Sequence, residues 1–196
     1  MASLPQYQKK MTESEYLKFE ENSDIKHEYI DGEIFAMTGA SRYHNTICVN
    51  VITSLRNQSK GSPCKIYPSD MRVKIESLSE YTYPDISLVC GDPQFAEGVF
   101  DSLINPILLI EVLSPSTEAY DRGKKFQIYR HMASLKEYIL IAQDSPHIER
   151  YYINKAGNWE LSDIIGLDNT LNLISVPYQF VMRDIYDLVI FKTDES

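Results

Sequence analysis

The stretch ILLIEVL, Ile107–Leu113, is an apolar run interrupted by a single acid, Glu111. A short run that is apolar at successive positions predicts a central strand with both faces buried. A carboxylate in such a strand must be paired, bound to a metal ion or facing a cleft, because an unpaired charge in an apolar interior is costly. Glu111 is therefore the first candidate for a functional residue.

A second acid, Asp85, follows Pro84 at the start of another predicted strand, Tyr83–Cys90. The loop after it returns the chain to Ile107–Leu113, so the two strands can bring Asp85 and Glu111 face to face. Carboxylate oxygens in that arrangement suit hard cations such as Mg²⁺ or Mn²⁺. The alternative is an ordinary strand-end or surface acid, which is easier to accept for Asp85 than for Glu111.

A lysine beside two metal-holding carboxylates can orient or deprotonate an attacking water and balance developing charge. Its usual place is two residues after the second acid, because positions i and i+2 share a strand face. Leu113 occupies that place here. Lys124 and Lys125 follow on a helix predicted over Glu118–Ala133, and Lys125 shares a helix face with Asp121. The alternative for this pair is a surface ion pair of little energetic value.

The rest of the chain predicts further helices and strands. We expect a helix from a capping box at Thr12 to about Asn22, a hairpin over Lys26–Gly39, a helix over Ser41–Ser59, a strand over Cys64–Ile75 bent at Pro68–Asp70, a loop over Pro93–Asn105, strands over Glu137–Gln143 and His147–Ile153, and short strands with a helical turn to Ile190. This pattern predicts a mixed α/β (α+β) fold in one domain, residues 1–196. Its central mixed or antiparallel sheet would be flanked by helices, with an N-terminal helix–hairpin extension and C-terminal β-hairpins.

Composition narrows the class of protein. The 196 residues carry a net charge of -9, which counts against a tight non-specific DNA binder. It does not exclude a nuclease, because a bound metal reverses the local sign of a carboxylate site.

No apolar run is long enough to span a bilayer, so we expect no membrane partner. Three scattered cysteines, Cys48, Cys64 and Cys90, argue against a zinc site and a disulfide framework and favour a reducing, cytoplasmic location.

Several motifs together closely resemble the restriction endonuclease family sometimes called Uma-type, within the PD-(D/E)xK nuclease superfamily. They are Pro84-Asp85, Ile110–Thr117, Asp121–Lys125, Tyr129, Glu137-Tyr138, the hairpin Tyr29–Glu33 and His44 before a helix. The resemblance covers about Thr12–Ile153. It implies a restriction-endonuclease-like fold, a divalent metal ion and hydrolysis of DNA phosphodiesters.

Carried over position by position, the resemblance makes Asp85 and Glu111 metal ligands and Lys125 the catalytic lysine. The lysine of this family has moved from the strand to the following helix, which matches Leu113 and Lys125. The backbone carbonyl of Val112 is an additional candidate ligand for Mg²⁺ or Mn²⁺.

Four further residues are weaker candidates for the site. Asp70 would add a carboxylate or simply make the bend in its strand. Glu28 would supply an extra acid, although a strand residue beside a turn is slightly favoured. His44 would contact a phosphate or ligand, or be satisfied by backbone. Tyr129 is more often a core residue than a catalytic one.

The sequence therefore predicts a Mg²⁺- or Mn²⁺-dependent DNA endonuclease, with a homodimer favoured if both strands of a duplex are cut. Two alternatives stay open. Leu113 and the net charge of -9 leave room for a catalytically inactive DNA-binding or interaction module on the same fold. A hydrolase acting on another phosphoester is the third reading.

Overall fold

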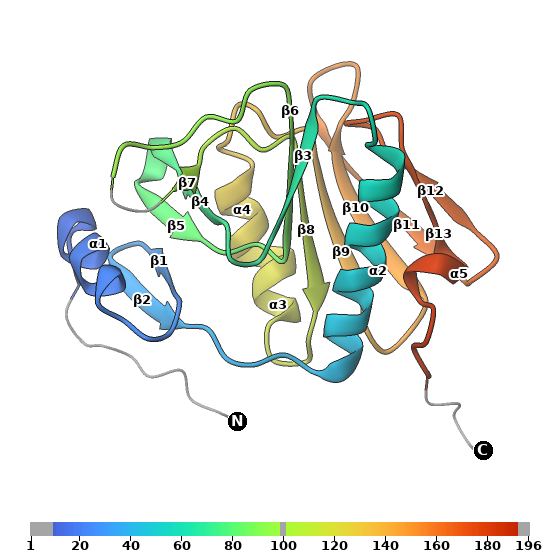
Figure 1. Ribbon diagram of the computed structural model, residues 1–196, viewed down its shortest axis with the longest axis horizontal. Coiled ribbons are helices and arrows are strands. Elements are labelled where there is room, and N and C mark those ends of the chain that lie inside the picture. The colour runs from blue at the N-terminus through green and yellow to red at the C-terminus, as the bar shows by residue number, and fades with distance from the viewer. Residues whose placement is uncertain (1–9, 99–100, 192–196) are drawn as a thin grey trace.

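The computed structural model describes residues 10–98 and 101–191, and its main layer is a six-stranded mixed sheet (Figure 1). The predicted apolar strand is β8 (Leu108–Leu113), which runs parallel to β9 (Glu137–Ala142) and antiparallel to β6 (Ile86–Cys90). All the residues of β8 are buried, as the sequence predicts. The outer strands are β3 (Cys64–Pro68) beside β6, and β10 (His147–Ile153) and β11 (Trp159–Ile165) beyond β9.

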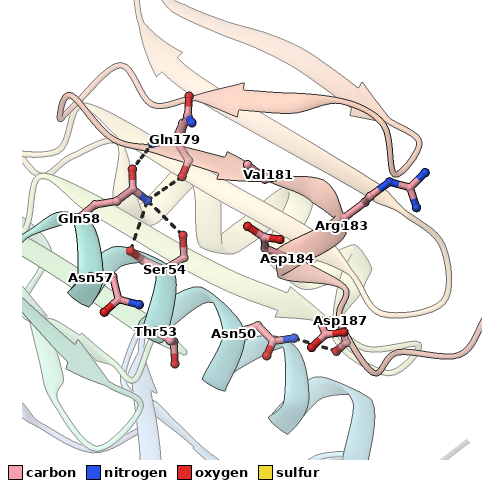
Figure 2. A pocket seen from close by; sticks show the side chains of 10 residues that line it. All are labelled: Asn50, Thr53, Ser54, Asn57, Gln58, Gln179, Val181, Arg183, Asp184 and Asp187. Atoms are coloured by element: carbon pink, nitrogen blue, oxygen red, sulfur yellow. Dashed lines mark hydrogen bonds between the residues drawn. The ribbon is translucent and has the colours of Figure 1, made fainter.

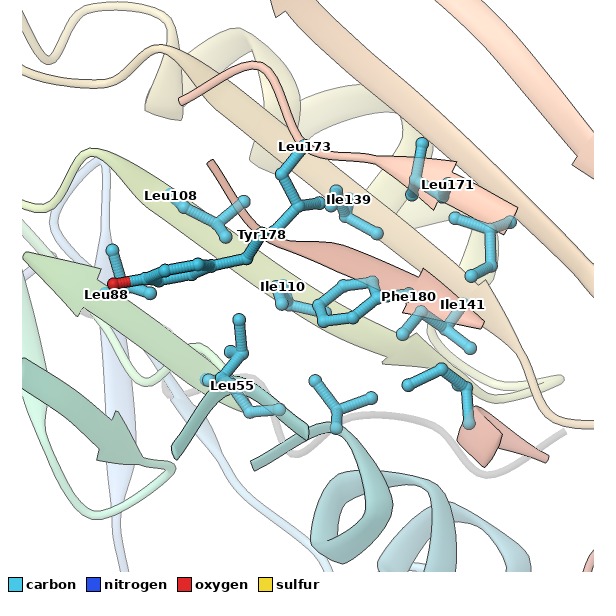
Figure 3. Packing of buried hydrophobic residues seen from close by; sticks show 14 of the residues in the cluster. Leu55, Leu88, Leu108, Ile110, Ile139, Ile141, Leu171, Leu173, Tyr178 and Phe180 are labelled. Carbon is cyan, nitrogen blue, oxygen red and sulfur yellow. The ribbon is translucent and has the colours of Figure 1, made fainter. Parts of the chain in front are cut away.

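One face of this sheet is covered by α2 (Arg42–Gln58) and α5 (Met182–Ile185). Ile47, Val51 and Leu55 lie on the buried side of α2, at the helical spacing expected from the sequence. They pack with Ile110 and Val112 of β8 and with the small hairpin of β12 (Thr170–Asn172) and β13 (Gln179–Val181). Figure 3 shows this core around Ile110, Ile139 and Phe180.

The opposite face packs against a second sheet of five short strands. In spatial order these are β2 (Glu33–Ala36), β1 (His27–Ile30), β5 (Glu80–Thr82), β4 (Arg72–Ile75) and β7 (Ser102–Leu103); the short 3-10 turn η1 (Glu76–Leu78) joins β4 to β5. Helix α1 (Glu13–Glu21) covers this sheet, and its Tyr16 ring stacks on Tyr29 at 4.8 Å. The predicted capping box between Thr12 and Glu15 is present.

The predicted mixed α+β architecture is confirmed, with four local differences, of which three concern strands. The strand expected over Cys64–Ile75 is two strands, β3 and β4, which turn apart after Pro68 into different sheets. The loop expected over Pro93–Asn105 contains β7, which pairs with β4. The strand expected from Tyr83 begins only at Ile86, so Asp85 lies just before it.

The helix predicted over Glu118–Ala133 is interrupted and ends sooner. It consists of α3 (Glu118–Tyr120), the π-helical turn η2 (Asp121–Lys125) and α4 (Phe126–Tyr129). A π-helical turn holds one more residue per turn than an α-helix and changes the direction in which later side chains point. This segment joins the parallel strands β8 and β9 and packs on the same sheet face as the second sheet.

The expectation of unpaired cysteines is wrong. Cys64 and Cys90 are register partners on the antiparallel strands β3 and β6, and they form a disulfide. The spacing rule missed the pair because only the register of two strands brings them together. The cytoplasmic location therefore stays a prediction that the cysteines no longer support. Across residues 10–98 and 101–191, no helix combines the length and apolarity needed to cross a bilayer.

Candidate active site

Glu111 is held at the centre of β8, and its side chain lies on the face that receives the second sheet. The strand alternates: Ile110 and Val112 enter the core under α2, whereas Leu109 and Leu113 enter the opposite core. Glu111 shares that opposite face and is only 4% exposed. Leu113, at the usual lysine position, is also on this face but is packed among apolar side chains.

Lys125 reaches Glu111 from the π-helical turn. Its Nζ lies 2.8 Å from Glu111 Oε1, 3.2 Å from Glu28 Oε1 and 3.5 Å from Asp121 Oδ1. The ammonium is buried, with 6% of the residue exposed. The long side chain of Lys125 thus brings an ammonium to Glu111 from the helix, although the strand position expected for the lysine is occupied by Leu113.

Tyr129 also contacts Glu111. Its hydroxyl donates to Glu111 Oε1 over 2.9 Å, and burial raises the pKa of Tyr129 well above its usual value, so the hydroxyl stays a donor. Tyr129 lies one turn after Lys125 on the same helix face. Both donors therefore hold the same oxygen of Glu111 and leave Oε2 with one long contact, 3.4 Å from the backbone nitrogen of Asp85.

Asp85 lies next to Glu111, where β6 begins beside β8. Asp85 Oδ2 accepts a hydrogen bond from the backbone nitrogen of Val112 over 2.7 Å. Asp85 Oδ1 lies 3.1 Å from Nε2 of His44, and Nδ1 of His44 lies 3.2 Å from the carbonyl oxygen of Val112. His44 comes from the first turn of α2, which Ser41 caps. His44 therefore contacts the carboxylate of Asp85 and the carbonyl of Val112, the two groups that the sequence analysis proposes as metal ligands in addition to Glu111.

Of the two weaker acidic candidates, Glu28 lies in the cluster around Lys125 and Asp70 lies outside it. Glu28 on β1 is buried and accepts hydrogen bonds from the backbone nitrogen of Tyr83 and from the hydroxyl of Tyr120, besides its ion pair with Lys125. It therefore belongs to the cluster. Asp70 does not: its side chain is 88% exposed and pairs with Lys26 at the bend between β3 and β4.

Comparison with known proteins places the chain in a family. A family model described as "Putative restriction endonuclease", Uma2, matches residues 13–183. The chain belongs to the Uma2 family. Two uncharacterized proteins of Synechocystis sp. are 40% identical over 177 residues (90% of this chain, 92% of theirs) and 35% identical over 156 residues (80% of this chain, 88% of theirs).

The Uma2 fold is also found among solved structures. A crystal structure from Anabaena variabilis, described as a "putative nuclease belonging to DUF820", superposes with a TM-score of 0.75 at 20% sequence identity. The match covers 92% of this chain and 99% of that one. It confirms the predicted restriction-endonuclease-like fold. Together with the family model, it makes this chain nuclease-like at the level of the family.

The electrostatics of the Uma2 site are dominated by buried acids. Burial raises the pKa of Glu111 to about 8; Lys125 opposes that rise, and the charge of Asp85 adds to it. Burial also raises the pKa of Asp121. Burial alone would lower the pKa of Lys125, but the charges of Glu111 and Glu28 outweigh it, and the pKa lies well above its usual value.

The donor set fits a divalent cation. Three carboxylates, of Glu28, Glu111 and Asp121, surround the ammonium of Lys125, so acids outnumber the lysine. The carboxylate of Asp85 lies beside Glu111 and pairs with His44. Asp85 and Glu111 each keep unused oxygen lone pairs beside the carbonyl of Val112. Hard oxygen donors with excess negative charge are what Mg²⁺ or Mn²⁺ requires.

Two residues of the cluster were not among the sequence candidates. Asp121 had a signal, because it stands four residues before Lys125 on one helix face. Tyr120 had none, because it reaches Glu28 only through the packing of α3 on the second sheet.

A hollow on the described surface lies away from the cluster. It measures about 720 Å³ and runs along the outer side of α2, against β13 and α5 (Figure 2). Its walls are polar, and Gln58 Nε2 bridges it to the carbonyl oxygen of Gln179 over 2.8 Å. None of the carboxylates around Lys125 lines it, so this hollow is separate from the cluster.

Proposed function

We propose that this Uma2 protein is a divalent-metal-dependent DNA endonuclease of the PD-(D/E)xK type. The observation that carries the proposal is the 2.8 Å contact between Lys125 Nζ and Glu111 Oε1. It supplies the lysine that Leu113 cannot supply, although the lysine comes from a different element of the fold.

The carboxylates of Asp85 and Glu111 and the carbonyl of Val112 would hold Mg²⁺ or Mn²⁺. When bound, such an ion polarises the phosphate and lowers the pKa of its water. Tyr129 and Lys125 fix one oxygen of Glu111, which orients the other toward Asp85. Asp85 is itself oriented by the backbone of Val112.

Lys125 acts in this mechanism as a cation. Because its pKa is raised by Glu111 and Glu28, the ammonium keeps its proton at neutral pH and is a poor general base. It would donate hydrogen bonds to the attacking water and stabilise the charge that develops on the phosphate. Water adds its oxygen to phosphorus and gives up one proton to solvent, one ester bond to phosphorus breaks, and the leaving oxygen takes up one proton from solvent.

The test is isosteric removal of each carboxylate. Asp85→Asn and Glu111→Gln should each abolish Mg²⁺-dependent cleavage of duplex DNA, with the fold checked by circular dichroism. Asp70→Asn is the matched control, because it removes an exposed carboxylate outside the cluster and should cleave like the wild type. Cleavage that persists in both cluster variants would overturn the assignment.

The alternative hypothesis, a catalytically inactive DNA-binding or interaction module, predicts a different experimental result. Leu113 and the net charge of -9 are the features that favour it. A wild-type protein that binds DNA while calorimetry detects no Mn²⁺ binding would establish that reading. Cleavage of small phosphodiesters without cleavage of DNA would instead assign the site to another phosphoester. Sedimentation of the active protein on a DNA duplex would test the predicted homodimer.

A further inference from the structure

A second group of metal-ligating side chains lies beside the carboxylate cluster. His44 and Cys48 stand one turn apart on α2 and face Asp85. One ligand atom from each of these three residues, an imidazole nitrogen, a thiol sulfur and a carboxylate oxygen, lies within 4.8 Å of the other two. All three residues are partly buried, and Cys48 is the free cysteine of the described residues.

Two of the three ligands are already oriented by one backbone residue. The carbonyl of Val112 lies 3.2 Å from Nδ1 of His44, and the nitrogen of Val112 donates to Oδ2 of Asp85 over 2.7 Å. These contacts leave Nε2 of His44 and Oδ1 of Asp85 directed at each other, 3.1 Å apart. A histidine that binds a metal through one ring nitrogen commonly donates its other N–H to a backbone carbonyl, which fixes the tautomer.

The kinds of donor atom select the kind of ion. Mg²⁺ prefers oxygen, whereas imidazole and thiolate suit Zn²⁺ and related borderline-soft ions. Tetrahedral Zn²⁺ accepts sulfur, nitrogen and carboxylate oxygen together, and three protein ligands leave a fourth position for water. Nothing in a CxxC rule would find this group, because its ligands come from one helix face and the start of a strand.

We propose that His44, Cys48 and Asp85 form a binding site for Zn²⁺ or a similar ion, distinct from the oxygen site at Asp85, Glu111 and Val112. Asp85 belongs to both sites, with Oδ1 directed toward His44. A Zn²⁺ ion held there would take up a ligand that Mg²⁺ also needs. The binding site itself stands on the side-chain geometry and does not depend on DNA cleavage.

The experiment is a titration of the full chain with Co²⁺, which replaces Zn²⁺ and reports a thiolate ligand by a ligand-to-metal charge-transfer band in the near ultraviolet. We expect one equivalent of Co²⁺ to produce the band and Zn²⁺ to abolish it by displacement. Cys48→Ser should lose the band and weaken Zn²⁺ binding, measured by calorimetry, by at least about tenfold. No DNA enters this assay, so its failure is separable from failure of the proposed nuclease activity.

The matched control is the double variant Cys64→Ser/Cys90→Ser, which removes the other two cysteines and keeps Cys48. It should retain the band. His44→Ala should weaken Zn²⁺ binding without removing the sulfur ligand, so a shifted band at higher Co²⁺ is expected. A wild-type protein without the band, or a band that survives in Cys48→Ser, would overturn the proposal.

Discussion

Replacing Lys125 with methionine should destabilise the protein in a pH-dependent way. Lys125→Met keeps most of the side-chain volume but removes the ammonium that lies between Glu111, Glu28 and Asp121. Breaking a buried ion pair by removing one partner typically costs about 3–5 kcal/mol. The loss arises because the remaining carboxylates are then buried close together without a counter-charge.

The sign of the pH effect follows from Glu111. Its pKa in the folded protein is about 8, above the ordinary 4.5, so the folded state binds more protons than the unfolded state between those values. The free energy of unfolding therefore falls as pH rises through this window. Without Lys125, which lowers that pKa, the fall continues to higher pH. The destabilisation by Lys125→Met should be largest near about pH 8.5 and substantially smaller near about pH 5.

Urea denaturation of wild type and Lys125→Met at both pH values measures the difference. Lys124→Met is the matched control, because it removes a neighbouring lysine whose side chain is exposed, and it should change the free energy of unfolding little at either pH. An equal loss of stability at both pH values would refute the reasoning, since carboxylate repulsion would then not be its source.

Three further predictions concern single contacts. Tyr129→Phe removes a buried hydrogen bond to Glu111 and should lower the free energy of unfolding by about 1.5–3 kcal/mol, measured by urea denaturation, with a parallel loss of Mn²⁺ affinity by calorimetry. Reduction of the Cys64–Cys90 disulfide, which closes a loop with a sequence separation of 26, should cost about 3 kcal/mol, and the double serine variant should make the reductant ineffective. Thr12→Ala should cost about 1 kcal/mol by loss of the capping box, and unchanged urea midpoints would show that α1 does not need it.

Local patterns in the sequence were enough to place the central strand and the two acids. The apolar run around Glu111 required a buried strand, and an acid in that run required a partner. The partner itself was harder to specify. Lys125 lies in a π-helical turn, and helical periodicity alone does not indicate where such a turn occurs or which strand its side chains meet.

Contacts between elements that are distant in the sequence could not be predicted from local patterns either. Glu28 lies 97 positions before Lys125 and meets it only because the second sheet packs on the face of β8 that carries Glu111. The disulfide likewise depends on the register of β3 against β6. Sequence patterns give the period of each element, whereas the register and packing that join elements depend on the whole core.

Val112 serves the site entirely through its main chain. Its side chain is in the core beneath α2, while its nitrogen and carbonyl hold Asp85 and His44. Exchange of its side chain for another apolar one of similar size would alter the core and leave both contacts in place. Alanine scanning at this position would report the lost core packing and not these main-chain contacts. An amide-to-ester replacement at residue 112 would remove the N–H that holds Asp85 and leave the side chain in the core.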